Sequence, residues 1–323
     1  MSHGGTPFTE FRVPEAPVIT VTPNPALDRT LRVDTLSFGG IARVQGVQED
    51  PGGKGINVSR VLRQFGCPTT ALGFLGGSAG RFLTDAMAKL AIDADFVAVP
   101  GETRTNLTMT DGEREIKVNE LGPRVPPHAV DALIARVRQR ARESSVVVLA
   151  GSLPPGIPIA FYAELIRIIQ DEGAKPVLDT AGPPLAHGVA AGPYLIKPNR
   201  REAETLLGIP LDTDDALREA VRRLSGYGIP IVALSLGAGG AICACDGMAW
   251  RAEVPPVAAL STVGSGDAFL ACLLLALLGG VDPRTALWVG TAAGLASVTL
   301  PGSRLCTPAE LERMLPLVSV RPL

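Results

Sequence analysis

Short apolar runs alternate with longer amphipathic segments along most of the 323-residue chain. The runs of strand length are VITVT (18–22), VVVLA (146–150), KPVLD (175–179), YLIKP (194–198) and PIVALSL (230–236). Segments with helical spacing are NVSRVLRQF (57–65), AVDALIARVRQRA (129–141), IAFYAELIRIIQ (159–170) and DALREAVRRL (215–224). This alternation predicts an α/β domain with a doubly wound, mostly parallel sheet that carries helices on both faces. In such sheets, ligands bind beyond the carboxyl ends of the strands.

Two stretches interrupt this alternation. LRVDTLSF (31–38) and IARVQGVQ (41–48) alternate apolar and polar residues, and NLTMTDGEREIKV (106–118) has a hairpin turn at Asp111 and Gly112. We therefore expect a small antiparallel β lid, made of segments at about 28–50 and 103–120. These segments would be inserted in a single domain over residues 17–323, and residues 1–16 would form a flexible tail.

Composition narrows the possible partners. The formal net charge is −2 and 19% of the residues are charged, which gives no basic surface for nucleic acid. The most apolar stretch, Leu270 to Leu278, is shorter than the roughly 20 residues that span a bilayer, so it predicts a core helix and no membrane partner. Five scattered cysteines and no secretory signal pattern favour a reducing cytoplasm.

The start of that apolar stretch carries an acid. In STVGSGDAFLACLLLALL (261–278), Asp267 directly follows Gly264, Ser265 and Gly266. A charge at the edge of a buried run is costly unless it is paired or used. One explanation is a helix cap. The other is chemical, because backbone N–H groups at a helix start can bind an anion while the acid accepts a hydroxyl proton during phosphoryl transfer.

A second glycine-rich turn lies near the N-terminus, in EDPGGKGINVSRVL (49–62). Gly52, Gly53 and Gly55 precede an amphipathic helix, with Lys54 inside the turn and Asn57 in the first helical turn. Glycines let backbone N–H groups approach a ligand, and the helix start favours an anion or a hydroxyl. A purely structural turn explains the glycines but not the lysine. The spacing matches neither a P-loop nor a dinucleotide fingerprint.

Two further turns predict a nucleotide and metal site. In IKPNRREAE (196–204), Asn199 and Glu202 share one face of a first helical turn, where they could hold Mg²⁺ through its water shell or form a capping box. We assign the neighbouring Lys197 to the nucleotide site. LSLGAGGAI (234–242) ends a strand and turns sharply, either to accept a nucleotide or as a simple hairpin. Its candidate nucleotide-binding residues are Ser235, Gly237 and Gly240.

The order of these motifs and their residues resemble those of the PfkB family of carbohydrate kinases, in the ribokinase-like superfamily. GGKGINVSR (52–60) and STVGSGDAF (261–269) stand about 200 residues apart with N-x-x-E between them, and the resemblance runs from Val18 to about Leu300. It implies a ribokinase-like fold, ATP and Mg²⁺ as cofactors, and Asp267 as the catalytic base. Gly264, Ser265 and Gly266 would stabilise the transferring phosphoryl group.

Three more motifs are typical of one branch of that family, which contains 1-phosphofructokinase, tagatose-6-phosphate kinase and the minor 6-phosphofructokinase. They are TPNPALDRT (22–30), TRTNLTM (103–109) and LAGSLPPGIP (149–158). By this resemblance, Asp28 would hold sugar hydroxyls and Arg104 would bind the phosphate already on the substrate. The other implied substrate residues are Gly52, Gly53, Lys54, Asn57, Asn106 and Ser152.

Lys54 matches a lysine of the first two kinase types, whereas the minor 6-phosphofructokinase type often has glycine there. Arg43 matches a position from which family members reach into a neighbouring subunit's site, and Ile41 departs from a second basic position. The resemblance thus implies a homodimer joined through the lid.

The implied reaction is ATP-dependent phosphorylation of the primary hydroxyl of a ketohexose monophosphate, first fructose 1-phosphate to fructose 1,6-bisphosphate. The alternatives are a 6-phosphofructokinase or a tagatose-6-phosphate kinase. A bare-sugar or nucleoside kinase would have no need of Arg104 and Lys54, and a non-catalytic sugar-phosphate sensor would be expected to lose the base or the glycine turn.

Overall fold

The computed structural model describes residues 12–37 and 39–323. Most of the expected N-terminal tail, residues 1–11, lies outside the described residues, as does Phe38 of the lid segment. Residues 12–17 precede the first strand without helix or strand of their own.

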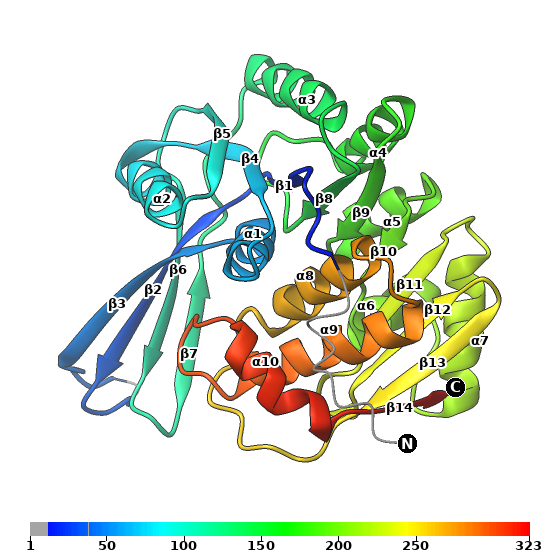
Figure 1. Cartoon of the computed structure of the whole chain (residues 1–323). Coiled ribbons are helices and arrows are strands. Elements are labelled where there is room, and N and C mark those ends of the chain that lie inside the picture. The colour runs from blue at the N-terminus through cyan, green and yellow to red at the C-terminus, as the bar shows by residue number, and fades with distance from the viewer. Residues whose placement is uncertain (1–11, 38) are drawn as a thin grey trace.

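A ten-stranded sheet forms the centre of the molecule, in the order β14-β13-β12-β11-β10-β9-β8-β1-β4-β5 (Figure 1). The seven strands from β11 to β5 are parallel, and β12, β13 and β14 extend the sheet in antiparallel fashion. The parallel strands are β1 Val18–Thr22, β4 Thr69–Leu75, β5 Asp93–Ala98, β8 Val146–Ala150, β9 Lys175–Asp179, β10 Leu195–Ile196 and β11 Ile231–Ser235. The antiparallel strands are β12 Ala241–Cys245, β13 Met248–Glu253 and β14 Ser319–Pro322.

Helices cover both faces of this sheet, which confirms the predicted α/β fold class (Figure 1). One face carries α1 Lys54–Gln64, α8 Ser265–Leu278, α9 Pro283–Val298 and α10 Pro308–Met314. The other carries α3 Pro127–Ala141, α4 Phe161–Asp171, α5 Gly182–Ala190, α6 Arg200–Leu207 and α7 Asp214–Ser225. The remaining elements are α2 Gly77–Lys89, which packs near β4, and the short 3₁₀ turns Gly237–Gly239 and Leu315–Leu317.

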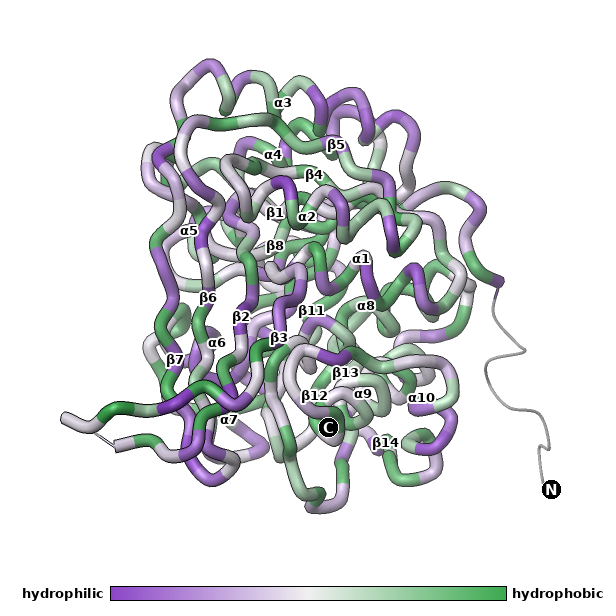
Figure 2. The backbone as a smooth tube through the Cα atoms, turned by 90° about the vertical axis from the view of Figure 1, so that its left-hand side faces the viewer, coloured by the Kyte–Doolittle hydropathy of each residue, from purple (hydrophilic) through white to green (hydrophobic). Residues whose placement is uncertain are grey.

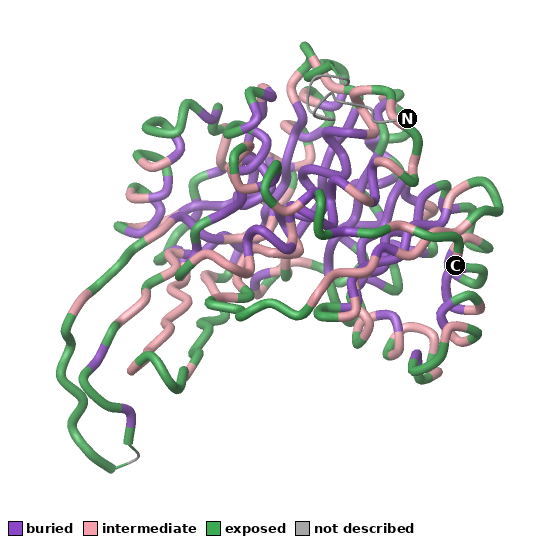
Figure 3. The backbone as a smooth tube through the Cα atoms, turned by 60° about the horizontal axis from the view of Figure 1, so that its bottom comes forward, coloured by how far each residue is buried: buried purple, intermediate pink, exposed green. Residues whose placement is uncertain are grey.

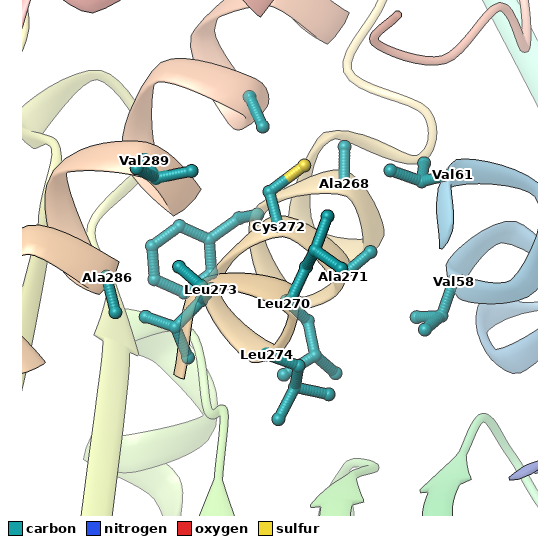
Figure 4. Packing of buried hydrophobic residues seen from close by; sticks show 14 of the residues in the cluster. Val58, Val61, Ala268, Leu270, Ala271, Cys272, Leu273, Leu274, Ala286 and Val289 are labelled. Atoms are coloured by element: carbon teal, nitrogen blue, oxygen red, sulfur yellow. The ribbon is translucent and has the colours of Figure 1, made fainter. Parts of the chain in front are cut away.

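The apolar run behind Asp267 is a core helix, as expected. In α8, every residue from Asp267 to Ala276 is buried, and the helix packs against α1 and α9 (Figure 4). Val58 and Val61 of α1 lie beside α8. Burial of their apolar surface fixes the position of the glycine-rich start of α1 relative to that of α8. Within residues 12–37 and 39–323, no helix is both long and apolar enough to cross a membrane.

A separate four-stranded sheet projects from the main body, in the order β3-β2-β6-β7 (Figures 1 and 3). Its strands are β2 Ala26–Val33, β3 Val44–Gly52, β6 Arg104–Thr110 and β7 Glu115–Asn119. The expected small antiparallel lid is present in the pairs β2–β3 and β6–β7, and the turn of the second hairpin follows Asp111. The central pair, β2–β6, is parallel, since the two hairpins come from distant parts of the chain.

The two faces of this lid differ in polarity. Side chains alternate between the faces of a strand, so cross-strand partners share a face. Asp28 pairs with Asn106 on one face, whereas Leu31 stands between Val47 and Met109 on the other. Figure 2 shows that the projecting loop of the lid also carries hydrophobic segments.

Candidate active site

The start of α8 is shaped by glycine. Gly264 is the N-terminal cap residue, with φ 75°, and a Cβ there would lie 2.4 Å from Leu305 Cδ2. No side chain caps this helix end, so Asp267 does not serve as the cap residue. The first N–H groups of a helix have no carbonyl partner within it, and here they belong to Ser265, Gly266 and Asp267. Their role in binding a phosphoryl group stays a prediction.

Asp267 meets the other glycine-rich motif directly. Asn57 Nδ2 donates a hydrogen bond to Asp267 Oδ2 at 2.8 Å, and the two residues are 5% and 7% exposed. Among the described residues, none donates a hydrogen bond to Oδ1. The two most specific motifs of the sequence, 210 residues apart, therefore converge on one carboxylate whose second oxygen is available.

Asp179 is a second buried carboxylate beside Asp267, and it was not among the predicted site residues. It is the last residue of β9 and is 1% exposed. Lys54 Nζ lies 2.7 Å from its Oδ1 and Lys197 Nζ lies 3.1 Å from its Oδ2. Its sequence signal was an acid ending a strand of a parallel sheet, at the edge where ligands bind.

These charges help to shift the pKa values of the two carboxyl groups in opposite directions. Burial, followed by the charge of Asp179, raises the pKa of Asp267 to about 6, although Asn57 and the two lysines oppose the shift. Burial alone would also raise the pKa of Asp179, but Lys197 and Lys54 outweigh it and the pKa of Asp179 is lowered. Paired acids with separated pKa values have distinct roles. Here Asp179 stays ionised and holds the lysines, and Asp267 titrates near neutrality.

Asp28 lies on the polar face of the lid, near the charges of Arg60 and Arg104. Asn106 Nδ2 donates to Asp28 Oδ1 at 2.8 Å, and burial raises the pKa of Asp28 although Asn106, Arg60 and Arg104 oppose the shift. A Cβ on Gly52 would lie 2.2 Å from Asp28 Cγ. Gly53 has φ 118°, and a Cβ there would lie 2.9 Å from Thr22 Cγ2. A side chain at position 52 would collide with Asp28, and one at position 53 would collide with β1, which explains both glycines.

A cavity of about 720 Å³ opens beside the buried charges. Of the predicted site residues, Lys54, Arg104, Ser152 and Glu202 line it, whereas Asn57 and Asp267 do not. Arg104 Nη1 donates to the carbonyl of Glu120 at 3.3 Å, and Arg104 Nε is buried without a partner. Lys54 and Arg104 place two cationic side chains on the wall of this cavity, so it suits an anionic group.

Asn24 is another cavity residue that was not predicted, although it stands in the quoted TPNPALDRT motif. Its Nδ2 donates to Ser152 Oγ at 3.1 Å and to the carbonyl of Leu121 at 3.0 Å. Because Ser152 accepts this hydrogen bond, its hydroxyl proton is left to donate toward the cavity. The hydrogen bond from Asn24 therefore orients the Ser152 hydroxyl as a donor.

The predicted nucleotide residues adjoin one another. Ser235 N donates to the carbonyl of Pro198 at 3.0 Å, and Asn199 and Ser235 form a parallel bridge. The glycines after Ser235 make a tight turn between β11 and β12, and a Cβ on Gly240 would lie 2.0 Å from the carbonyl oxygen of Ala252. The hairpin alternative is therefore present. Nucleotide contact by Ser235, Gly237 and Gly240 stays a prediction.

Lys197, which we assigned to the nucleotide site, belongs to the buried group of charges around Asp179. It is 4% exposed, and a Cβ built on Gly266 would stand 3.4 Å from its Nζ. The ammonium group therefore lies between Asp179 and the start of α8, and its contact with a nucleotide stays a prediction.

Asn199 and Glu202 form a capping box on α6, which was one of the two alternatives predicted for this pair, beside a magnesium site. Asn199 Oδ1 accepts from Glu202 N, and Glu202 Oε2 accepts from Asn199 N, both at 2.9 Å. Glu202 lines the cavity, and its Oε1, which takes no part in the capping box, lies 4.0 Å from Lys54 Nζ. Mg²⁺ keeps several waters and needs few protein oxygens, so this arrangement fits a water-mediated ion. The described residues contain no cluster of three or more His, Cys, Asp or Glu side chains that could enclose a metal.

Arg43 is not brought to this centre in its own chain. It is exposed on the segment before β3, where its backbone N–H donates to Asp34 Oδ1 at 2.9 Å. It neither lines the cavity nor pairs with the buried charges.

A mostly parallel sheet with a β lid, and a glycine-flanked acid at the start of a buried helix, define a ribokinase-like α/β protein. Residues 24–310 match the model of the pfkB family carbohydrate kinases. The chain therefore belongs to the PfkB family of carbohydrate kinases, as the sequence motifs indicated.

Solved structures agree over almost the whole chain. A Staphylococcus aureus protein, provisionally assigned as a phosphofructokinase, is 31% identical over 95% of this chain and 99% of its own, with TM-score 0.82. Phosphofructokinase-2 from Escherichia coli is 28% identical over 93% and 98%, with TM-score 0.88. A Thermotoga maritima protein, provisionally assigned as a 1-phosphofructokinase, is 26% identical over 95% and 99%, with TM-score 0.85.

The raised pKa of Asp267 makes a prediction for stability. Between the unfolded value of 3.8 and the folded value of about 6, the native state binds the extra proton, so stability falls as pH rises through this window. Asp267→Asn removes the charge but keeps an oxygen for Asn57. It should raise the Tm of the ligand-free protein at pH 8, and the gain should vanish below about pH 4.

The exposed Asp85→Asn provides the control and should leave Tm unchanged at both pH values. A Tm for Asp267→Asn at or below that of the wild type at pH 8 would show that the buried charge is not destabilising.

Proposed function

We propose that the chain is an ATP-dependent kinase that phosphorylates the primary hydroxyl of a ketohexose monophosphate, with fructose 1-phosphate to fructose 1,6-bisphosphate as the first choice. The observation that carries the kinase assignment is the buried carboxylate of Asp267 at the start of α8, beside Lys54 and Lys197. Membership of the carbohydrate kinase family supports it.

In this proposal Asp267 accepts the proton of the substrate's hydroxyl. The freed oxygen bonds to the γ-phosphorus of ATP while the bond from that phosphorus to the ADP oxygen breaks. A base with a pKa of about 6 is largely ionised at neutral pH and still holds a proton well enough to assist the transfer. The N–H groups at the start of α8 and the ammonium of Lys197 lie where negative charge develops.

The nucleotide would lie along Asn199, Ser235 and the glycine turn that follows. Mg²⁺ supplies charge neutralisation for the phosphate oxygens when it is bound. Glu202 Oε1, with the capping Asn199, would hold its water shell.

The substrate's own phosphate would bind in the cavity. The Arg104 guanidinium, the Lys54 ammonium and the Ser152 hydroxyl, which accepts from Asn24 and so keeps its proton to donate, would hold that phosphate from the cavity wall. Phosphofructokinase-2 from E. coli has been crystallised with fructose-6-phosphate. Fructose 6-phosphate and tagatose 6-phosphate are therefore the alternative substrates, and Lys54 favours fructose 1-phosphate or tagatose 6-phosphate by family resemblance.

A substrate panel tests this proposal. With Mg²⁺ and ATP, ADP formation is measured for fructose 1-phosphate, fructose 6-phosphate, tagatose 6-phosphate, fructose and ribose. We expect the highest kcat/KM with fructose 1-phosphate and far lower values with the two bare sugars. Turnover of bare sugars alone would contradict the phosphate site, and no turnover with any sugar would favour the sensor alternative.

Arg104→Ala tests the phosphate site. Removing a guanidinium that binds substrate and transition state alike should raise KM for the sugar phosphate by about tenfold to a hundredfold, with little change in KM for ATP. Lys117→Ala, which removes an exposed charge from the neighbouring strand β7, is the matched control and should leave both KM values near normal. Equal increases in both KM values for Arg104→Ala would point to a misfolded lid.

We also propose that two lids pair to form a homodimer. The register of the strands gathers apolar side chains on the lid face opposite Asp28, and Val47 and Val118 are 52% and 51% exposed there. Ile41, on the projecting loop, is 83% exposed. A two-fold contact between such faces would cover both at once. It would also bring Arg43 toward the partner's cavity.

Mixing two inactive variants tests whether Arg43 acts across that contact. Arg43→Ala and Asp267→Asn chains are each assayed alone and after subunit exchange, with mixed dimers verified by differently tagged chains. A mixed dimer has one site with both residues intact, so part of the wild-type activity should return. Verified mixed dimers without recovery would exclude action of Arg43 in trans, and an active monomer in sedimentation would exclude the dimer.

A further inference from the structure

Arg60 lies at a junction of three chain segments close to the buried carboxylate. It follows Asn57 by three residues on α1, so the two side chains share a helix face. Arg60 Nη1 donates to Asn57 Oδ1 at 3.0 Å and to the carbonyl of Pro51, in lid strand β3, at 3.1 Å. Arg60 Nη2 donates to the carbonyl of Ser303, in the loop between α9 and α10, at 3.3 Å.

These bonds fix the orientation of the Asn57 amide. A guanidinium group has donors only, so the amide atom that faces Arg60 must be the oxygen. The amide nitrogen is then forced toward Asp267, where it donates at 2.8 Å. Without Arg60, the amide could rotate by 180° and turn its oxygen toward the carboxylate, which would replace a hydrogen bond with repulsion.

We infer that Arg60 is a positioning residue for the proposed phosphoryl transfer, because it holds Asn57 as a hydrogen-bond donor to Asp267 and ties that donor to the end of the lid strand β3. It touches neither the cavity nor the proposed base itself. The inference rests on the proposed kinase function, and it adds a residue that acts through Asn57.

The charges around this chain of contacts are distributed over several elements. Asp267 faces Lys54 from α1, Asp179 from β9 and Lys197 from the segment after β10. Arg60 faces Asp28 from β2, Asp50 from β3 and Asp267 from α8. The guanidinium thus interacts both with the lid carboxylates and with the carboxylate of Asp267. Its removal takes away a positive charge and an oriented donor together, and both losses make Asp267 harder to ionise.

Arg60→Met tests the inference, since it keeps the apolar stem and removes charge and donors. Activity is followed with fructose 1-phosphate, or with whichever sugar phosphate of the panel the wild type uses best. We expect kcat to fall about tenfold with little change in KM for ATP, and the acidic limb of the kcat–pH profile to move to higher pH. Arg60→Lys restores a cationic donor and should move the limb back toward the wild-type position. Arg63→Met, exposed on the same helix, is the matched control.

A second readout needs no turnover. The Tm gain of Asp267→Asn over its parent grows with pH until Asp267 is fully ionised, so in an Arg60→Met background this growth should extend to higher pH. In an Asn57→Ala background, Arg60→Met should cost far less kcat than it does alone, because the relay is already broken.

The inference is overturned if Arg60→Met leaves the pH profile and the Tm series unchanged, or if its kcat loss is the same with and without Asn57. Its failure is distinct from failure of the proposed function. An inactive wild type across the whole substrate panel rejects the kinase, whereas an active wild type with an indifferent Arg60→Met variant rejects only the role of Arg60.

Discussion

Two carboxylates and two ammonium groups meet at the carboxyl end of the parallel sheet, and three of them, Asp179, Asp267 and Lys197, are buried where an unpaired charge would be costly. Asp179 is the fixed member, because Lys54 and Lys197 hold it ionised. Asp267 is left as the acid with a raised pKa. The chemistry proposed for this protein depends on that asymmetry, since a base must be able to take up and release a proton near neutral pH.

The surrounding fold brings these groups together from distant parts of the chain. Lys54 begins α1, Asp179 ends β9, Lys197 follows β10, and Asp267 lies in the first turn of α8. Packing of α1 against α8 sets the 2.8 Å contact between Asn57 and Asp267, and Gly52 and Gly264 leave the space that the lid and the C-terminal loop need to approach. The site is therefore assembled by tertiary packing, with glycine at the points of closest contact.

Local pattern was enough to predict β1, β8, β9 and β11 of the main sheet, the core helix and the two lid hairpins, because the strand and helix periods appear in neighbouring residues. It did not single out β4 and β5 or the antiparallel strands β13 and β14. YLIKP nevertheless forms a strand only at Leu195–Ile196, and the parallel β2–β6 pair could not be read from either hairpin alone. The motifs located Asp267, Asn57 and Lys54. The partners Asp179, Asn24 and Arg60 were missed, since their importance lies in contacts to residues far away in the sequence.

The most direct test of the account is the kcat of Asp267→Asn at pH 8, with saturating Mg²⁺, ATP and the best sugar phosphate. The variant keeps the shape of the side chain and the partner of Asn57 but cannot accept a proton. The account predicts a kcat lowered by roughly 10² to 10⁴, with nucleotide binding retained. A kcat close to that of the wild type would contradict it, because the buried carboxylate would then have no part in the chemistry.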